Sequence, residues 1–308
     1  MGDLLLEEWG DTPFSRLARL PYYRHDLLGD GNLVIPWIQR GFVAMALGEP
    51  VGRQDAPGSA VQEFVARRRS EGLKTVFAPI RQTHRTVFQN AGLQVLLIGK
   101  SARLSLPTFD LRGRKARSLR HALNRGQRVG YRFELVTHRG LDWRELKEVS
   151  DHWLAQKRLP ELRVGMGWFD PATLRGSRIG LIRNRFDRVE AFVSLIEDYR
   201  MNETAVDLMR YRPNAGPGTM DFLLTRLALA LQEEGKQTLD LGLAPLAGWS
   251  DGLGGRALRR ILEFGRPLYN FEGLYAFKNK FQPRWENRYL AFDSPLALPR
   301  LFATLASR

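Results

Sequence analysis

Apolar and polar positions along the chain fall into blocks that predict strands and helices in alternation. In the first hundred residues, apolar runs of strand length occupy residues 41–48, 74–80 and 93–99. Between them, residues 59–73 and 83–92 carry apolar side chains at the spacing of a helix. Strands that alternate with helices are typical of a sheet covered by helices, so we expect an α/β or α+β fold.

The second half of the chain repeats this order. Residues 188–198 and 204–212 have the pattern of consecutive strands, residues 219–235 that of a long helix, and residues 237–245 that of a further strand. The similar order suggests a duplicated fold, although no repeat is visible at the level of single residues. With 308 residues, of which 44% are apolar, the chain is long enough for two units of ordinary size.

A strongly basic segment, residues 109–136, lies between the two halves. Its apolar residues Ala116, Leu119 and Leu123 form a narrow stripe on a predicted helix whose other positions are mostly cationic. This helix is either a solvated connection or a binding site for phosphates, which the arginine fork contacts with two N–H donors. We favour phosphate binding, because arginine predominates and acids are nearly absent. The predicted phosphate-binding or tRNA-binding residues are Arg114, Arg117, Arg120, Arg125 and Arg128.

Charge and residue types narrow the classes of function. Lys and Arg number 47 against 33 Asp and Glu, an excess of +14 that attracts nucleic acid, anionic lipid or phosphorylated ligands. The chain has no cysteine and its five histidines are far apart, so we expect no disulfide, thiol nucleophile, metal site or cofactor. Neither a signal peptide nor a membrane span is recognisable, which predicts a cytoplasmic protein that can rest on the inner face of the cell membrane.

The stretch from Val206 to Leu224 combines an apolar strand, a turn rich in glycine and proline, and the start of an apolar helix. Such a turn directs backbone N–H groups and the positive end of a helix at one point, where an anion can bind. The same pattern also describes a plain chain reversal with Thr219 as the helix cap, and the usual nucleotide-binding glycine motifs are absent. The predicted substrate-binding residues are Arg212, Gly216, Gly218 and Thr219, together with Arg288.

Charged residues on the strand before this turn are candidates for chemistry. Strand alternation places Asp207 and Arg210 on opposite faces, unless a bulge intervenes. The aromatic-rich segment 269–292 adds further candidates, namely Glu272, Lys278 and Lys280. This segment is either an aromatic core whose lysines reach water or a cationic pocket that holds phosphates and polarises an ester.

These stretches resemble the cytosolic catalytic region of the multiple peptide resistance factor family, the bacterial phosphatidylglycerol lysyl- and alanyltransferases. The resemblance rests on VDLMRYRPNAGPGTMDFLL, LDLGLAPLAG, ALGEPVG and the segments 110–136 and 269–292, and it extends from about Gly41 to Leu301 in the same order. It implies a tandem of two GCN5-related N-acetyltransferase (acyl-CoA N-acyltransferase) folds joined by the basic helix. The predicted division is an N-terminal acyltransferase-like domain (1–108), the connecting helix (109–137) and a C-terminal catalytic domain (138–308).

The resemblance also implies an activity. Lysine or alanine would pass from aminoacyl-tRNA to the glycerol hydroxyl of phosphatidylglycerol, which changes membrane charge and resistance to cationic antimicrobial peptides. Asp207 would be the base for the lipid hydroxyl, with Glu272 as the competing candidate. The cationic side chains Arg210, Lys278 and Lys280 would meet the charge on the reacting carbonyl and the lipid phosphate, and no covalent intermediate is expected.

Three other functions remain open at this point. One is a coenzyme A-dependent N-acyltransferase, although in that family the basic residue usually stands one position closer to the first glycine of the loop than Arg212 does here. A second is aminoacyl transfer from tRNA to another lipid or a peptidoglycan precursor. The third is a basic module that binds RNA or membrane without chemistry. Family members usually carry a membrane-spanning flippase region before this one and GDPVG where this chain has GEPVG, so the chain is a stand-alone homologue or a fragment.

Overall fold

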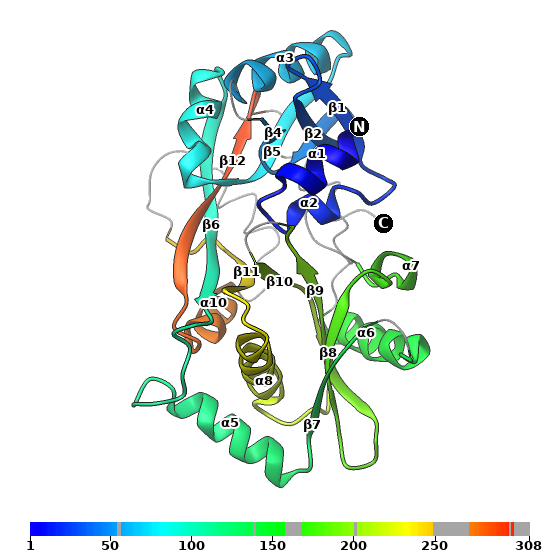
Figure 1. Cartoon of the computed structure of the whole chain (residues 1–308), viewed down its shortest axis with the longest axis vertical. Helices are drawn as coiled ribbons and strands as arrows, with labels where there is room; N and C mark the ends of the chain where they lie inside the picture. The colour runs from blue at the N-terminus through cyan, green and yellow to red at the C-terminus, as the bar shows by residue number, and fades with distance from the viewer. Residues whose placement is uncertain are drawn as a thin grey trace.

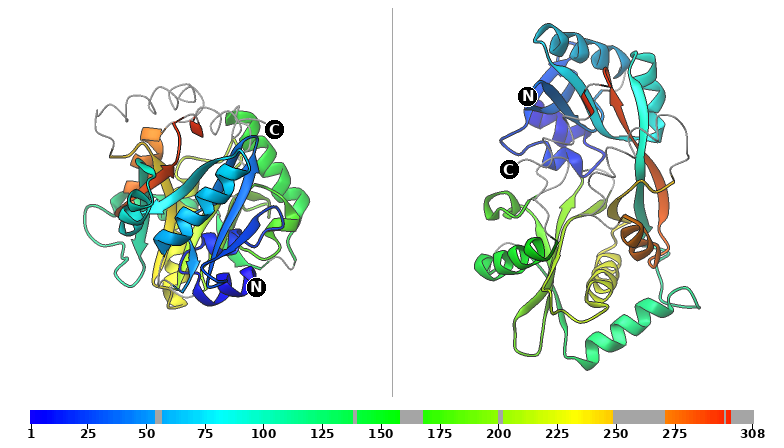
Figure 2. Two further views of the ribbon diagram at one scale, coloured as in Figure 1. Left: turned by 90° about the horizontal axis from the view of Figure 1, so that it is seen from above. Right: turned by 180° about the vertical axis from the view of Figure 1, so that it is seen from behind.

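The computed structural model describes residues 1–53, 57–137, 140–157, 168–199, 202–248, 271–295 and 297–298. The chain has a mixed α/β fold, as the alternating pattern predicted (Figure 1). The molecule is elongated, with α3 and α4 at one end and α5 at the other (Figure 2). None of the helices in the described ranges has the length and apolarity that a bilayer span requires.

The elements of the first half include every strand and helix that the sequence pattern predicted there. In order they are α1 (Gly2–Trp9), α2 (Phe14–Leu17), β1 (Arg24–Leu28), β2 (Leu33–Arg40), β3 (Val43–Leu47), β4 (Val51–Gly52), α3 (Pro57–Ser70), β5 (Lys74–Arg81), the 3-10 helix η1 (Gln82–His84), α4 (Arg85–Asn90) and β6 (Gln94–Ser105). The pattern did not predict the elements before β3, and β6 continues six residues beyond the predicted strand.

The second half contains longer helices. Its elements are α5 (Arg117–Arg128), β7 (Arg132–Val136), α6 (Trp143–Lys157), α7 (Pro171–Leu174), β8 (Arg178–Arg183), β9 (Val189–Glu197), β10 (Glu203–Tyr211), α8 (Thr219–Glu233), β11 (Thr238–Pro245), α10 (Phe271–Asn279) and β12 (Arg284–Phe292). The predicted strands β9, β10 and β11 and the predicted helix α8 are confirmed. Helix α6 is amphipathic and was not predicted from the sequence.

The described strands join into one mixed sheet, in the order β1-β2-β3-β5-β12-β6-β11-β10-β9-β8-β7, with β4 paired to β2. Strand β12 comes late in the chain, yet it lies between β5 and β6 and runs antiparallel to both (Figure 1). Strand β6 pairs with β12 through residues 94–103 and with β11 through residues 99–105. The sheet is therefore continuous from one half of the chain to the other, while the three-part division at residues 108 and 137 stays a prediction.

Helices α8 and α6 cover opposite faces of the second half of the sheet. On β9, Val193 belongs to the apolar core under α8, whereas its neighbour Phe192 belongs to the core under α6. Strand alternation explains this division, because successive side chains point to opposite faces. A residue of β10 can therefore be assigned to the α8 face or to the α6 face according to the apolar core in which its side chain is packed.

Helix α5 lies in the basic segment and packs against α8. Its buried residues are Leu119, Ala122 and Gly126. A Cβ on Gly126 would lie 2.2 Å from the ring of Phe222, so only glycine allows this close approach of the two helices.

Candidate functional site

Two parallel strands separate in the middle of the second half of the sheet. Strands β10 and β11 share three residue pairs, the last of them between Ala205 and Asp240. Just beyond that pair, β10 has a bulge against β9 between Val206 and Met209, and β11 has a bulge against β6 between Asp240 and Leu243. Bulges bend the strands that carry them, so two bulges at one level direct β10 and β11 apart. We call residues 206–209 and 240–243 the strand divergence.

The side chain of Lys278, from α10, reaches into the strand divergence. Its Nζ donates a hydrogen bond of 2.8 Å to the carbonyl of Leu243. A Cβ built on Gly242 would lie 3.5 Å from this Nζ and 3.7 Å from the carbonyl oxygen of Val206, so the amine sits close to both strands. Lys278 is 2% exposed. Burial lowers the pKa of Lys278 to about 8, and nearby Asp240 opposes that shift, so the amine can give up its proton near neutral pH.

Asp240 is held in place by two donors. The hydroxyl of Ser101 donates to both carboxylate oxygens at 2.9 Å, and the backbone N–H of Gly242 donates to Oδ1 at 2.7 Å. Gly242 has φ +84, a left-handed conformation that glycine adopts without strain. The carboxylate therefore fixes the bulge of β11 and supplies the charge that opposes the lowered pKa of Lys278.

Asp207 lies in the bulge of β10 and is half-buried. The hydroxyl of Ser194 lies 3.5 Å from its Oδ2 and also accepts the backbone N–H of Leu208 at 3.0 Å. Ser194 stands between Val193 and Leu195, which both face α8, so the carboxylate of Asp207 lies on the α6 face. The bulge thus removes the strict alternation that would have placed Asp207 and Arg210 on opposite faces.

The N-terminal half approaches Asp207 through Tyr22. The pKa of Tyr22 is raised above its ordinary value, by burial first and then by Tyr23 and the carboxylate of Asp207. The rings of Tyr22 and Trp168 have centroids 4.7 Å apart, which joins this residue to the second half of the chain. An aromatic wall therefore lies next to the predicted base.

Arg210 points toward α6 and away from solvent. It is 7% exposed, and its guanidinium carbon lies 4.2 Å from the ring centroid of Trp153. Its Nε donates to the hydroxyl of Ser150 at 3.4 Å. These contacts hold β10 against α6, so Arg210 supports the strand that carries Asp207.

A network of buried and half-buried charges crosses the same region of the sheet. Glu203, at the start of β10, accepts a hydrogen bond of 2.7 Å from Arg103. Arg103 is also 3.5 Å from Glu286, which in turn is 3.2 Å from Arg288. Burial raises the pKa of Glu203 to about 7, despite the opposing charge of Arg103. The predicted substrate-binding residue Arg288 is 6% exposed and belongs to this network.

Three predicted residues lie elsewhere. The Nζ of Lys280 is 2.8 Å from Asp221 in the first turn of α8, so this lysine does not join Lys278. Glu272, the competing base, is exposed on the first turn of α10. Arg212 donates a hydrogen bond of 2.7 Å to the carboxylate of Glu148 on α6. This ion pair engages the guanidinium that was expected to bind phosphate.

The glycine-rich loop between β10 and α8 is in contact with α5. Gly218 is the left-handed N-cap of α8, and a Cβ on it would lie 3.6 Å from that of Ala122. The alternative in which Thr219 caps the helix is wrong, because Thr219 is the first residue of α8 itself, and its hydroxyl donates a hydrogen bond of 2.6 Å to the carbonyl of Gly216. Arg125 of α5 donates 3.3 Å to the carbonyl of Pro217. The small residues of this loop therefore make room for α5.

The cations of α5 and of the turn before it divide into two groups. Arg120 donates to the carbonyl of Gly113 at 2.7 Å, which ties down the segment before the helix. Arg114, Arg117 and Arg128 are exposed, and a surface cavity of about 270 Å³ is lined by Arg117, Arg120, His121, Leu123 and Asn124. The outer face of the helix is thus available to a polyanion. The five arginines predicted to bind phosphate do not all lie on that face in the same state, because some of them hold backbone carbonyls instead.

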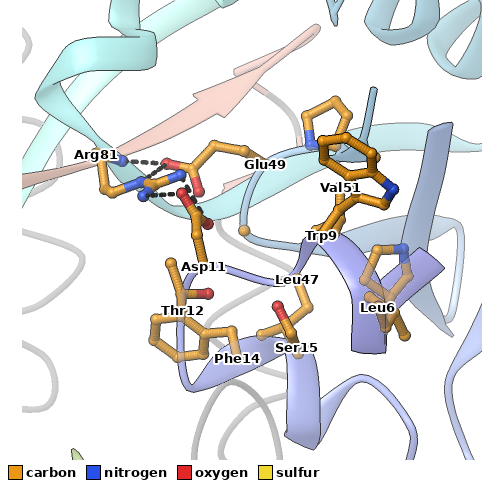
Figure 3. Close-up of a pocket in the computed structure, with 14 residues that line it drawn as sticks. Leu6, Trp9, Asp11, Thr12, Phe14, Ser15, Leu47, Glu49, Val51 and Arg81 are labelled. Atoms are coloured by element: carbon orange, nitrogen blue, oxygen red, sulfur yellow. Dashed lines mark hydrogen bonds and ion pairs between the residues drawn. The ribbon is translucent and has the colours of Figure 1, made fainter. Parts of the chain in front are cut away.

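A second polar cluster lies in the first half, next to β3 and β5 (Figure 3). Glu49 accepts the backbone N–H of Arg81 at 2.6 Å, and the guanidinium of Arg81 donates to Asp11 at 2.7 Å. The cavity beside these residues holds about 10 Å³, the space of a single water molecule. Charges in this cluster satisfy one another, which leaves little room for a ligand.

The residues Asp240, Ser101, Glu203 and Tyr22 were not among the predicted site residues. A signal for Asp240 was present, because it is a single acid between Leu239 and Leu241 in an apolar strand, just as Asp207 is. No group of three or more His, Cys, Asp or Glu side chains suited to a metal ion occurs among the residues that the structure describes.

Comparisons with known proteins agree on one family. Residues 4–292 match the family model described as "Phosphatidylglycerol lysyltransferase, C-terminal". A phosphatidylglycerol lysyltransferase of Bacillus subtilis is 33% identical over an alignment of 298 residues, which covers 93% of this chain and 34% of the relative. The chain therefore spans about a third of the length of the curated relatives it matches.

Solved structures extend this similarity to three dimensions. One is the C-terminal domain, from Agrobacterium fabrum, of a protein assigned as a lysylphosphatidylglycerol synthetase, with a TM-score of 0.85, 31% identity, and coverage of 99% of this chain and 95% of that one. L-PGS from Bacillus licheniformis has a TM-score of 0.84 and 29% identity, with coverage of 98% and 94%. More distant structures such as FemX, with a TM-score of 0.59 and 10% identity, and a tandem GNAT protein, at 0.50 and 12%, share the fold alone.

Proposed function

Because the chain belongs to the family of the phosphatidylglycerol lysyltransferase C-terminal region, we propose that it transfers lysine or alanine from aminoacyl-tRNA to the glycerol hydroxyl of phosphatidylglycerol. The observation that carries the proposal is the strand divergence, which holds a half-buried carboxylate, Asp207, on β10 and a buried amine of lowered pKa, Lys278, between β10 and β11. A carboxylate that accepts a proton and an amine that donates one suit ester exchange.

In the proposed reaction Asp207 takes the proton of the lipid hydroxyl while that oxygen forms a bond to the ester carbonyl. The ammonium of Lys278 faces the negative charge that develops on the carbonyl oxygen. As the bond to the ribose oxygen breaks, Lys278 gives that oxygen a proton, and solvent later moves the proton from Asp207 back to Lys278. One ester is broken and one is formed, so no outside reactant is needed.

Other parts of the chain have supporting roles in this proposal. The two halves would be a tandem of acyltransferase folds of the GNAT type, with residues 109–137 as the connection. Arg210 would hold β10, and hence Asp207, against α6. The basic surface would keep the protein on the anionic inner face of the membrane, where its lipid substrate is found.

The proposal is tested by incubating the protein with tRNA charged with lysine or alanine and vesicles of phosphatidylglycerol, followed by mass spectrometry of the lipids. We expect a lipid heavier by one aminoacyl group. Asp207→Asn should reduce the rate by roughly 100-fold or more while leaving tRNA binding intact. Glu272→Gln is the matched control and should retain wild-type activity, because Glu272 is exposed. Near-normal activity of Asp207→Asn would remove this residue from the role of base.

The role of α5 has its own test. Replacing Arg114, Arg117 and Arg128 with Ala should weaken tRNA binding and flatten the dependence of affinity on salt, by about one unit of slope for each phosphate that is no longer neutralised. Arg67→Ala with Arg69→Ala, on the exposed side of α3, is the control. An unchanged salt slope in the α5 variant would identify the helix as a solvated connection.

A further inference from the structure

A partly exposed aromatic pair lies on α10 and β12, and the proposed chemistry does not use it. Tyr275 of α10 stacks on Trp285 of β12, with ring centroids 4.4 Å apart and an angle of 22° between the planes. The indole N–H of Trp285 donates 3.2 Å to the side chain of Asn279. Tyr275 is 37% exposed. In the described part of the chain, five large apolar side chains are at least this exposed, and Tyr275 is one of them.

Two partly exposed cations are neighbours of this pair, and each of them also contacts an acid. The side chain of Arg284, directly before Trp285, is 81% exposed and pairs with Glu286, and that of Lys280 is 40% exposed and pairs with Asp221. A stacked aromatic surface bordered by cations matches the requirements of single-stranded nucleic acid, whose bases stack while the backbone stays near positive charge. An acyl chain would gain from the rings but nothing from the neighbouring cations.

The pair is also close to the proposed reaction. Tyr275 and Lys278 are three residues apart on α10, which corresponds to a rise of about 4.5 Å along the helix. Tyr275 is partly exposed while Lys278 is buried, so the helix carries a stacking surface and a reactive amine within one turn. In Figure 1, α10 and the start of α5 lie along the same edge of the molecule.

We propose that Tyr275 and Trp285 form the seat for a base of the single-stranded 3′ end of RNA, specifically the terminal adenine of the aminoacyl-tRNA donor. This inference rests on the proposed function, since it assumes that the donor is tRNA. The stacked base would hold the attached ribose near Lys278, whose ammonium then faces the ester. Phosphates of the duplex would meet the outer cations of α5.

The first experiment measures binding of the oligoribonucleotide ACCA by fluorescence anisotropy, and needs no transfer activity. Tyr275→Ala should weaken binding roughly five- to hundred-fold, the usual loss for one stacked base. Tyr275→Phe should restore affinity, because the ring is retained. The control Phe186→Ala removes another exposed aromatic ring, on the β8–β9 turn, and should bind as the wild type does.

The second experiment uses whole tRNA with and without its terminal adenosine. Tyr275→Ala should lower affinity for the intact tRNA and leave affinity for the shortened tRNA unchanged. Tyr275→Leu keeps apolar packing on Trp285 and covers the case in which the Ala variant does not fold. Equal binding of both tRNAs by wild type and variants would overturn the inference, and so would a raised KM for phosphatidylglycerol with unchanged RNA binding.

Failure of the seat and failure of the proposed function give different results. If the wild type transfers an aminoacyl group and all Tyr275 variants bind and react normally, only the seat is wrong. If the wild type transfers nothing from any charged tRNA but binds ACCA in a Tyr275-dependent manner, the seat stands and the reaction must be another one.

Discussion

The two halves of the molecule contain the same arrangement of parallel strands with opposite outcomes. In the first half β3 and β5 stay paired over the whole length of β3, through five residue pairs from Val43–Lys74 to Leu47–Ala78. In the second half β10 and β11 pair three times and then separate. Each pair of strands is connected through a helix, α3 or α8. What differs is the pair of bulges, which turns a closed sheet into a place where a side chain can enter.

Buried charge follows the same difference. Beyond the paired strands of the first half, Glu49 and Arg81 neutralise each other, and the adjoining cavity holds about 10 Å³. At the strand divergence of the second half, Lys278 is buried with a backbone carbonyl as its acceptor and a pKa lowered to about 8. In the first half the buried charges are paired and stabilise the fold. In the second half burial disfavours the charged form of Lys278, which makes this amine a candidate for proton transfer.

The largest effect should come from Lys278→Met. We expect transfer to fall at least 100-fold, because the cation opposite the reacting carbonyl is lost. In the wild type the folded pKa of about 8 is below the ordinary 10.5, so the unfolded chain binds more protons between these values. The free energy of unfolding should therefore rise by about 3 kcal/mol from pH 8 to 10.5, and this rise should be absent in Lys278→Met. Urea titrations at several pH values measure it, and an identical rise in the variant would contradict the burial argument.

The matching change in the first half is Glu49→Ala. It removes two hydrogen bonds to Arg81 from a site that is 7% exposed and leaves Asp11 as the other acid partner, which should lower the free energy of unfolding by about 3 kcal/mol. Transfer by the protein that remains folded should not change. Calorimetry and a rate assay at low temperature separate the two quantities. A loss of rate without a loss of stability would mean that this cluster belongs to the reaction after all.

A third change acts on the charge network next to the divergence. The folded pKa of Glu203, about 7, is above the ordinary 4.5, so the folded chain binds more protons between these values. Burial of Glu203 should thus make unfolding easier by about 3 kcal/mol as pH rises from 4.5 to 7. Glu203→Gln should remove this slope, as denaturation at pH 5 and pH 7 will show. If the variant keeps the slope, another group is responsible.

The smallest effect concerns two glycines with left-handed backbone. Gly242→Ala and Gly41→Ala should each cost about 1 kcal/mol of stability, since both residues have positive φ. A methyl on Gly242 would lie 3.5 Å from the amine of Lys278, whereas none of the described atoms lies within 4 Å of a methyl on Gly41. The rate of transfer should therefore fall a few-fold in Gly242→Ala alone. Equal rates of transfer in the two variants would mean that the amine of Lys278 does not take part in the reaction at this position.

The pattern of apolar positions predicted the fold where an element is an apolar run or has an apolar face. Strands β3, β5 and β9 are nearly continuous apolar runs, and strands β10 and β11 alternate apolar and polar positions. Helices α3 and α8 carry apolar side chains at helical spacing, so all these ranges were recognisable. The position of β12 was not predictable, because its partners β5 and β6 are fixed by contacts far away in sequence. The bulge at Asp207 could not be predicted from the sequence. A bulge is a shift in register against the neighbouring strand, so it depends on residues of that strand.

The candidate site was predicted in part for a similar reason. Asp207 and Lys278 stood out as charges in apolar surroundings, and the structure brings both to the strand divergence. In the sequence Lys280 and Arg212 looked as suitable for the site as Lys278. In the structure each is paired with an acid on a helix, Asp221 or Glu148, and the sequence pattern does not predict either pairing. Residue type indicates which groups can react, whereas only the packing decides which of them are already paired.

The insertion of β12 between β5 and β6 has a consequence for synthesis of the chain. As the ribosome releases the first half, β5 and β6 each have an open edge, and the strand that fills the place between them emerges about 180 residues later. Open edges invite pairing with other chains, and long-range pairing is slow. We therefore expect the early half to depend on chaperones until residue 292 has been made, and the two halves to become stable together.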